Sequence, residues 1–139
     1  MHQFMAALRV ATLASLALAA LPATAGPREL LAGYETAARQ AKPAFAGFSA
    51  ARGATFFQDR HGNDWSCASC HSANPAASGK HAKTGKEIAP LAPAANPQRF
   101  ADAAKTEKWF DRNCKDVLGR VCTAQEKGDV LVYLMSIAK

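Results

Sequence analysis

The five residues CASCH, Cys67 to His71, constrain this chain more than any other stretch. Two thiols three residues apart can reach two vinyl groups on the same edge of a haem and form thioethers. The adjacent histidine can then turn its imidazole under the ring and bind the iron. The motif therefore predicts one covalent haem c, attached through Cys67 and Cys70, with His71 as the proximal iron ligand.

Two other uses of a Cys-x-x-Cys pair fit the rest of the chain poorly. A thioredoxin-like dithiol would require alternating strands and helices, and the sequence shows no such alternation. A zinc site would require a second compact ligand pair, whereas Cys114 and Cys122 are too far apart in sequence for the usual knuckle. The proline-containing stretch EIAPLAP offers backbone carbonyls for the second ring nitrogen of His71, and we expect the carbonyl around Pro90 to accept it.

The first 25 residues have the pattern of a secretory signal peptide. An uncharged apolar run from Val10 to Pro22 follows Arg9, and small residues precede Gly26. The run is shorter than the roughly 20 residues that span a bilayer. We therefore expect cleavage after Ala25, a periplasmic protein, and no membrane span in the mature chain of residues 26–139.

The composition is that of an ordinary globular domain, with 49% hydrophobic and 20% charged residues. The net charge of +6 is spread along the chain. Because there is no block of lysine and arginine and no interleaving with aromatic residues, we expect no nucleic-acid binding.

Helical periodicity predicts an all-α chain. The expected helices span residues 28–41, 44–58, 97–105, 107–118 and 124–138. Residues 72–97 contain four prolines and show no strand alternation, so they are predicted to form a long loop that wraps around another group.

The predicted helix ends rest on capping patterns. Asn96 with Pro97 predicts one N-terminus, Thr106 the next, and Gly119 a C-terminus. Thr123 and Glu126 have capping-box spacing before the last helix. Four residues of that helix are expected to face the core: Val130, Leu131, Leu134 and Ala138.

The sequence around the haem motif resembles class I cytochromes c. Gly53 and Phe57, four residues apart, precede the motif, and VLVYL, residues 130–134, resembles the aromatic-containing terminal helix of that family. The resemblance implies that these two helices cross at the glycine. It also implies that Met135, the one methionine after residue 25, faces away from the haem, although methionine is the usual distal ligand.

Other distal candidates are His61, His81, no ligand at all, or a residue of the 107–118 helix. On that helix, charged residues form an outer stripe with the expected pairs Asp111–Lys115 and Arg112–Asp116. Asn113 lies on the opposite, apolar face. A buried amide needs partners, so Asn113 is either a core residue bonded to loop backbone or a ligand aimed at the iron. The periodicity leaves both readings open.

Two residues of the same helix are candidates for the haem edge. The indole N–H of Trp109 can donate to a haem propionate, since a buried tryptophan usually needs an acceptor, although plain core packing remains the alternative. Arg112 is the second candidate for a propionate contact.

A closer resemblance covers nearly all of residues 26–139. The stretches KTGKEIAPLAP, NPQRF, EKWFDRNC and GRVCT resemble the oxygen-binding class I cytochromes c of the sphaeroides haem protein type. The resemblance implies that residues 26–139 form a cytochrome c domain with an added N-terminal helix. It further implies that Asn113 is the distal ligand of the oxidised haem, and that Cys114 and Cys122 form a disulfide. The expected electron partner is a dihaem c-type cytochrome.

Two functions follow as hypotheses. The first is a haem protein that accepts electrons and, after reduction releases Asn113, binds a diatomic gas such as oxygen, with reduction of oxygen species as a further option. The second is a plain electron carrier with a permanently six-coordinate iron, for which Met135 or a histidine would be required. A peroxidase-like enzyme is a weaker third hypothesis, because neither His61 nor His81 has a recognisable partner motif.

Overall fold

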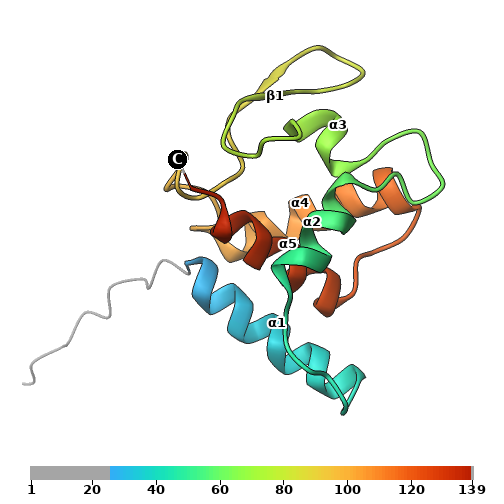
Figure 1. The fold of residues 1–139 in the computed structure, drawn as a ribbon, viewed down its shortest axis with the longest axis vertical. Coiled ribbons are helices and arrows are strands. Elements are labelled where there is room, and N and C mark those ends of the chain that lie inside the picture. The colour runs from blue at the N-terminus through green and yellow to red at the C-terminus, as the bar shows by residue number, and fades with distance from the viewer. Residues whose placement is uncertain (1–25, 139) are drawn as a thin grey trace, which may run out of the picture.

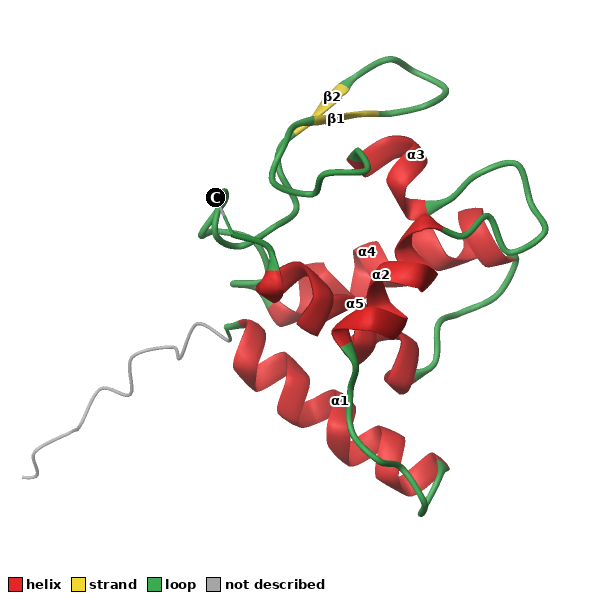
Figure 2. Ribbon diagram, viewed as in Figure 1, coloured by secondary structure: helices red, strands yellow, loops and turns green. Residues whose placement is uncertain are grey.

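The computed structural model describes residues 26–138 (Figures 1 and 2). The predicted signal peptide and its cleavage site lie outside these residues. The elements are α1 (Pro27–Ala41), α2 (Ala50–Gln58), α3 (Cys67–His71), β1 (Gly79–Lys80), β2 (Glu87–Ile88), α4 (Ala103–Leu118) and α5 (Ala124–Ser136). The predicted helical fold with an added N-terminal helix is confirmed. Within the described residues, no helix is long and apolar enough to cross a membrane.

The crossing of α2 and α5 organises the core. Gly53 is buried at this crossing, and a Cβ on it would lie 1.9 Å from the carbonyl oxygen of Asp129. Only glycine allows the two backbones to approach so closely. The core cluster beside the crossing joins Phe57 of α2 to Tyr133 and Leu134 of α5. The expected crossing at the glycine is confirmed.

Helix α1 packs against α5 and extends the core at its lower end in Figure 1. Leu30 and Tyr34, one helical turn apart, are buried with Leu131 of α5. The hydroxyl of Tyr34 donates to Glu107 of α4, whose other carboxylate oxygen accepts from Lys127 of α5 at 2.6 Å. A shared carboxylate therefore joins three helices at this point.

A short antiparallel hairpin corrects the prediction of a strandless loop. In β1 and β2, Gly79 pairs with Ile88 and Lys80 with Glu87, above α3 in Figure 2. Two-residue strands are too short to produce visible alternation in a sequence. The rest of residues 72–97 forms turns and loops, as expected.

Three predicted helix starts, at residues 44, 97 and 107, are wrong. Helix α2 begins at Ala50 rather than at residue 44, because Gly47 has φ +100° and Ser49 caps the helix by accepting from the N–H of Arg52. Residues 97–100 form turns rather than a helix, and Phe100 has φ +63°. Helix α4 therefore begins after Asp102.

The capping residue of α4 is Asp102, which accepts from the N–H of Lys105 at 2.9 Å. Thr106 lies inside the helix, where its hydroxyl donates to the Asp102 carbonyl at 2.7 Å. Serine and threonine hydroxyls often make this backward bond within helices, so the capping signal was misleading here. Gly119, with φ +70°, ends α4 as expected.

The capping box of Thr123 and Glu126 begins α5, as predicted. The helix ends at Ser136, so Ala138 is exposed rather than inward. Val130, Leu131 and Leu134 are buried as expected.

Candidate haem site

Helix α3 presents both haem-motif cysteines on a short, well-capped turn. Ser66 accepts from the N–H of Ser69 at 3.2 Å, and the Ser69 hydroxyl accepts from the N–H of Ser66 at 3.0 Å. Cys67 and Cys70 are free thiols. Cys67 packs against the core cluster of α2 and α5, and burial raises the pKa of its thiol to about 11. The thiols are therefore available for thioether formation.

His71 ends α3 with an imidazole that has no partner within residues 26–138. Its Nδ1 is buried without a hydrogen bond. Burial, with a smaller contribution from the positive charge of Arg99, lowers the pKa of His71 to about 4. The imidazole is therefore neutral at neutral pH, as a metal ligand must be.

The expected support of His71 by the carbonyl around Pro90 is not seen. The Pro90 carbonyl oxygen accepts instead from Arg99 Nε at 2.8 Å and from Asn96 Nδ2 at 3.3 Å. The Arg99 side chain also donates to the Ala89 carbonyl at 2.6 Å. A carbonyl oxygen has two lone pairs, and both acceptor positions of the Pro90 oxygen are taken by Arg99 Nε and Asn96 Nδ2.

Apolar side chains from several elements share a core cluster with residues of α3. Leu91 and Phe100 of the long loop and Phe110 of α4 are partly buried and pack against the same core cluster as Cys67 and Ala68. The unpartnered imidazole, the two free thiols and these apolar groups fit a covalently bound haem c. Cys67, Cys70 and His71 are the residues that would hold it.

Asn113 lies in the second-last turn of α4, beside Cys114. The predicted disulfide is present, with Cys114 and Cys122 Cα atoms 5.6 Å apart. Asn63, in the loop before α3, donates to the Val117 carbonyl at 2.9 Å. The C-terminal end of α4 is thus tied both to the loop before α5 and to the segment that leads into the haem motif.

The amide of Asn113 makes no hydrogen bond with any residue from 26 to 138, and the residue is half-buried. A core asparagine would be expected to bond to nearby backbone. Its neighbours Cys114 and Val117 are buried, and Phe110, one turn earlier, packs on the core. Asn113 therefore lies beside the buried residues of α4, and its amide has no hydrogen-bond partner among residues 26–138.

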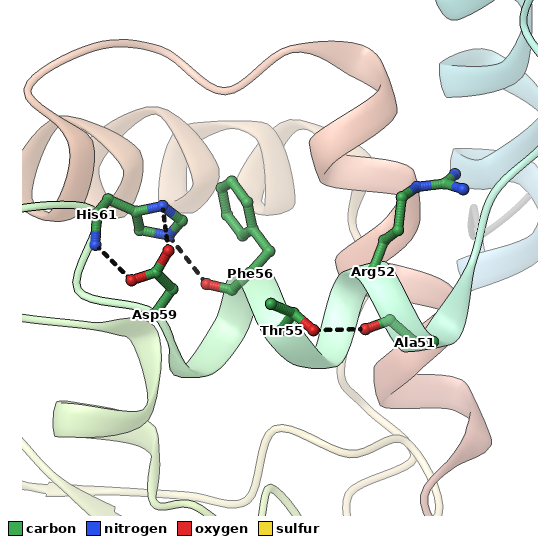
Figure 3. A pocket seen from close by; sticks show the side chains of 6 residues that line it. All are labelled: Ala51, Arg52, Thr55, Phe56, Asp59 and His61. Carbon is green, nitrogen blue, oxygen red and sulfur yellow. Dashed lines mark hydrogen bonds and ion pairs between the residues drawn. The ribbon is translucent and has the colours of Figure 1, made fainter.

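The alternative candidates for the distal ligand, His61, His81 and Met135, have other surroundings. Figure 3 shows His61 beside Phe56 and Asp59 at the end of α2; its Nε2 is 2.9 Å from the Phe56 carbonyl oxygen and its Nδ1 is 3.6 Å from Asp59. His81 is exposed in the hairpin turn, where its Nδ1 accepts from the N–H of Thr84. Met135 is 37% exposed. Its exposure agrees with a side chain that faces solvent, and its expected orientation away from the haem stays a prediction.

Trp109 is 47% exposed, so the expectation of a buried or core tryptophan is wrong, and the Arg112 guanidinium lies over its ring at 5.1 Å. The Asp111–Lys115 pair forms at 2.8 Å, whereas in the described part of the chain Arg112 pairs with the indole rather than with Asp116. The propionate contacts predicted for Trp109 and Arg112 stay predictions.

A helical fold around a Cys-x-x-Cys-His turn defines a monohaem c-type cytochrome. Residues 43–134 match a family described as a domain of unknown function (DUF1924). The chain is 48% identical over 125 residues to the cytochrome c-type protein SHP of Cereibacter sphaeroides, covering 85% of this chain and 92% of that protein. The chain therefore belongs to this family of c-type cytochromes and carries covalent haem c.

Solved structures agree with this assignment. Oxidised cytochrome c'' from Methylophilus methylotrophus has a TM-score of 0.73 at 39% identity, covering 81% of this chain and 95% of that one. The structure of oxidised SHP, described as an oxygen-binding cytochrome c, has a TM-score of 0.69 at 46% identity, covering 79% and 96%. The class I cytochrome fold is thus shared with both solved proteins along almost the whole of their length.

Arg99 and Asn63 were not predicted as residues of the site region. Arg99 is the one arginine in the apolar, proline-rich stretch 88–101, and its bonds to the Ala89 and Pro90 carbonyls depend on how this loop folds back. The bond of Asn63 to the end of α4 joins residues 54 positions apart, so no local pattern marks it.

Proposed function

We propose that this protein is a periplasmic monohaem cytochrome that exchanges electrons and binds a small diatomic gas such as oxygen, with Asn113 as a distal ligand that leaves on reduction. The haem supplies an iron whose charge changes by one unit and whose distal face takes an exchangeable ligand. The observation that carries the proposal is the uncommitted amide of Asn113 on a helix end fixed by a disulfide.

The amide of Asn113 suits a reversible ligand. A neutral amide oxygen binds iron weakly and is attracted most strongly by the more positive, ferric state. Reduction lowers that attraction, so the side chain can swing away while α4 stays in place. Once free, the amide can donate a hydrogen bond to a gas molecule.

The end of α4 limits how far Asn113 can move. The disulfide of Cys114 holds the next residue, and the bond from Asn63 holds the last turn. A side-chain rotation is therefore the expected movement, rather than unwinding of the helix. This keeps the amide near the distal position in both oxidation states.

The relatives support two parts of the proposal. The SHP structure is described as that of an oxygen-binding cytochrome c. A solution structure of the Methylophilus cytochrome c'', 39% identical to this chain with a TM-score of 0.73, is described as giving insights into haem-ligand detachment. Both gas binding and loss of an iron ligand thus occur among proteins of this fold.

The plain-carrier alternative requires a strong distal ligand. Met135 and His61 are the side chains it needs, and both have other surroundings in the structure. A dihaem c-type cytochrome remains the proposed electron partner.

Absorption spectra of the purified holoprotein test the proposal. The reduced protein should show high-spin features in the absence of gas and a new spectrum when oxygen is added. Sharp low-spin bands in the reduced protein that oxygen leaves unchanged would support the plain carrier instead.

A further inference from the structure

The hairpin of β1 and β2 presents a concentration of unpaired positive charge. Lys80, Lys83 and Lys86 lie within seven residues and are all exposed, and Glu87 is the only acid between residues 79 and 88. None of the three lysines forms an ion pair with another described residue, whereas Lys115 and Lys127 elsewhere do. The surface of the hairpin therefore carries a net positive charge.

The turn that carries these lysines is ordered by its own backbone. The N–H of His81 donates to the Lys86 carbonyl and the N–H of Gly85 to the His81 carbonyl, both at 2.8 Å. Gly85 has φ +68°, which permits the tight turn. The charges are thus held on a defined surface.

The same hairpin lies directly on the haem attachment. The backbone N–H of Ala82 donates to Cys70 Sγ at 3.4 Å. A Cβ on Gly79 would lie 2.1 Å from the Cys70 carbonyl oxygen, so the hairpin backbone touches α3 closely. A thioether sulfur keeps lone pairs, so the contact with Ala82 is compatible with covalent haem.

We infer that residues 79–88 are the docking surface for an acidic redox protein, and that electrons pass between the partner and the haem through Cys70 and the Ala82 backbone. The inference rests on the electron exchange in the proposed function and adds the surface and the charge of the partner. Electron exchange falls steeply with distance, so the surface that touches a thioether sulfur is favoured. Complementary charge accelerates encounter and selects the orientation.

A membrane surface fits the hairpin less well. The large hydrophobic side chains that are exposed on the described surface, Trp109, Val121 and Met135, lie outside it. Binding at a bilayer interface normally uses such side chains in addition to charge. An acidic protein is therefore the favoured occupant.

Stopped-flow oxidation of the reduced holoprotein tests the inference, with hexacyanoferrate(III) as an anionic probe. One electron leaves the protein and converts the probe into hexacyanoferrate(II). The variant Lys83→Gln/Lys86→Gln removes two hairpin charges. The matched control Arg28→Gln/Lys42→Gln removes two exposed charges from α1 and its C-cap; α1 lies away from the hairpin, in the lower half of Figure 1.

At low ionic strength, the oxidation rate of the hairpin variant should fall about threefold or more. The oxidation rate of the control should fall by less than about half of that factor, and the two variants should react equally fast at high salt. The cationic probe hexaammineruthenium(III) should react faster with the hairpin variant. Equal losses in both variants would overturn the inference, because only total charge would then matter. Salt-stable binding to phosphatidylglycerol vesicles that the hairpin variant loses would also overturn it.

The reduction potential should be equal in wild type and both variants, which separates docking from driving force. If the wild type exchanged electrons with neither probe, the electron-transfer part of the proposed function would fail. If it exchanged electrons with no effect of the hairpin lysines, the docking inference alone would fail.

Discussion

The disulfide between Cys114 and Cys122 joins the last turns of α4 to the loop before α5, with an S–S distance of 1.99 Å. Both cysteines are buried, and Asn113 is the residue immediately before the first of them. The cross-link therefore acts on the part of α4 that carries the proposed distal ligand. Its effects on stability and on the iron should be measurable together.

Replacing both cysteines, Cys114→Ser with Cys122→Ser, should lower the free energy of unfolding by about 2.5 kcal/mol, the loop-closure value for a ring of this size. The ferric spectrum should also change, because the helix end that holds Asn113 loses its anchor. Denaturant unfolding and absorption spectra of the ferric holoprotein measure both effects. Val121→Ser, in the same loop and 55% exposed, is the control and should change neither.

Gly53→Ala should destabilise the protein by about 2 kcal/mol or more, because an added methyl group would press on the backbone of α5. Its Cβ would lie 1.9 Å from the Asp129 carbonyl oxygen and 2.9 Å from Tyr133 Cβ. Gly33→Ala in α1 is the matched substitution, since a Cβ there meets nothing within 4 Å. It should stabilise by roughly 0.5–1 kcal/mol, because alanine favours the helix. Thermal unfolding measures both effects. Equal shifts of the melting temperature in the two variants would contradict the close crossing of α2 and α5.

Tyr34 should respond to alkaline pH in a distinctive way. Burial and the hydrogen bond to Glu107 raise the pKa of its hydroxyl well above the ordinary value of 10. The folded state therefore favours the protonated form, and this stabilising contribution is complete below pH 10 and decreases as pH rises above it. The stability of wild type should fall more steeply above pH 10 than that of Tyr34→Phe, as measured by denaturant unfolding. Parallel curves would show that Tyr34 ionises normally.

Trp109→Phe tests the predicted propionate contact. If the indole N–H donates to a haem propionate, its loss should shift the reduction potential while the fold is retained. Redox titration with circular dichroism as a check on folding measures this. An unchanged potential would leave packing against Arg112, seen at 5.1 Å, as the role of the ring.

The helical fold could be predicted because its main determinants are local. Gly119 and the pair Thr123 and Glu126 mark helix ends through contacts a few residues apart, and they were identified correctly. The predicted cap at Thr106 is wrong because a threonine hydroxyl can accept from a later backbone N–H as a cap or donate to an earlier carbonyl within a helix. Thr106 does the second, and Asp102 takes the capping position.

The haem motif was predictable because Cys67, Cys70 and His71 are consecutive in one turn. The hairpin was not, since its pairing of Gly79 with Ile88 involves two residues per strand. Arg99 was also missed, because its approach to the Pro90 carbonyl depends on how the long loop folds back.

The central claim concerns Asn113, and Asn113→Ala tests it most directly when spectra are recorded in both oxidation states. The ferric spectrum should change and become sensitive to pH, because a water molecule that replaces the amide can titrate. The ferrous spectrum should change little, because the amide has already left. A structural asparagine would instead give a loss of about 1–3 kcal/mol in stability with unaltered spectra. A ferric spectrum identical to that of wild type would contradict the account.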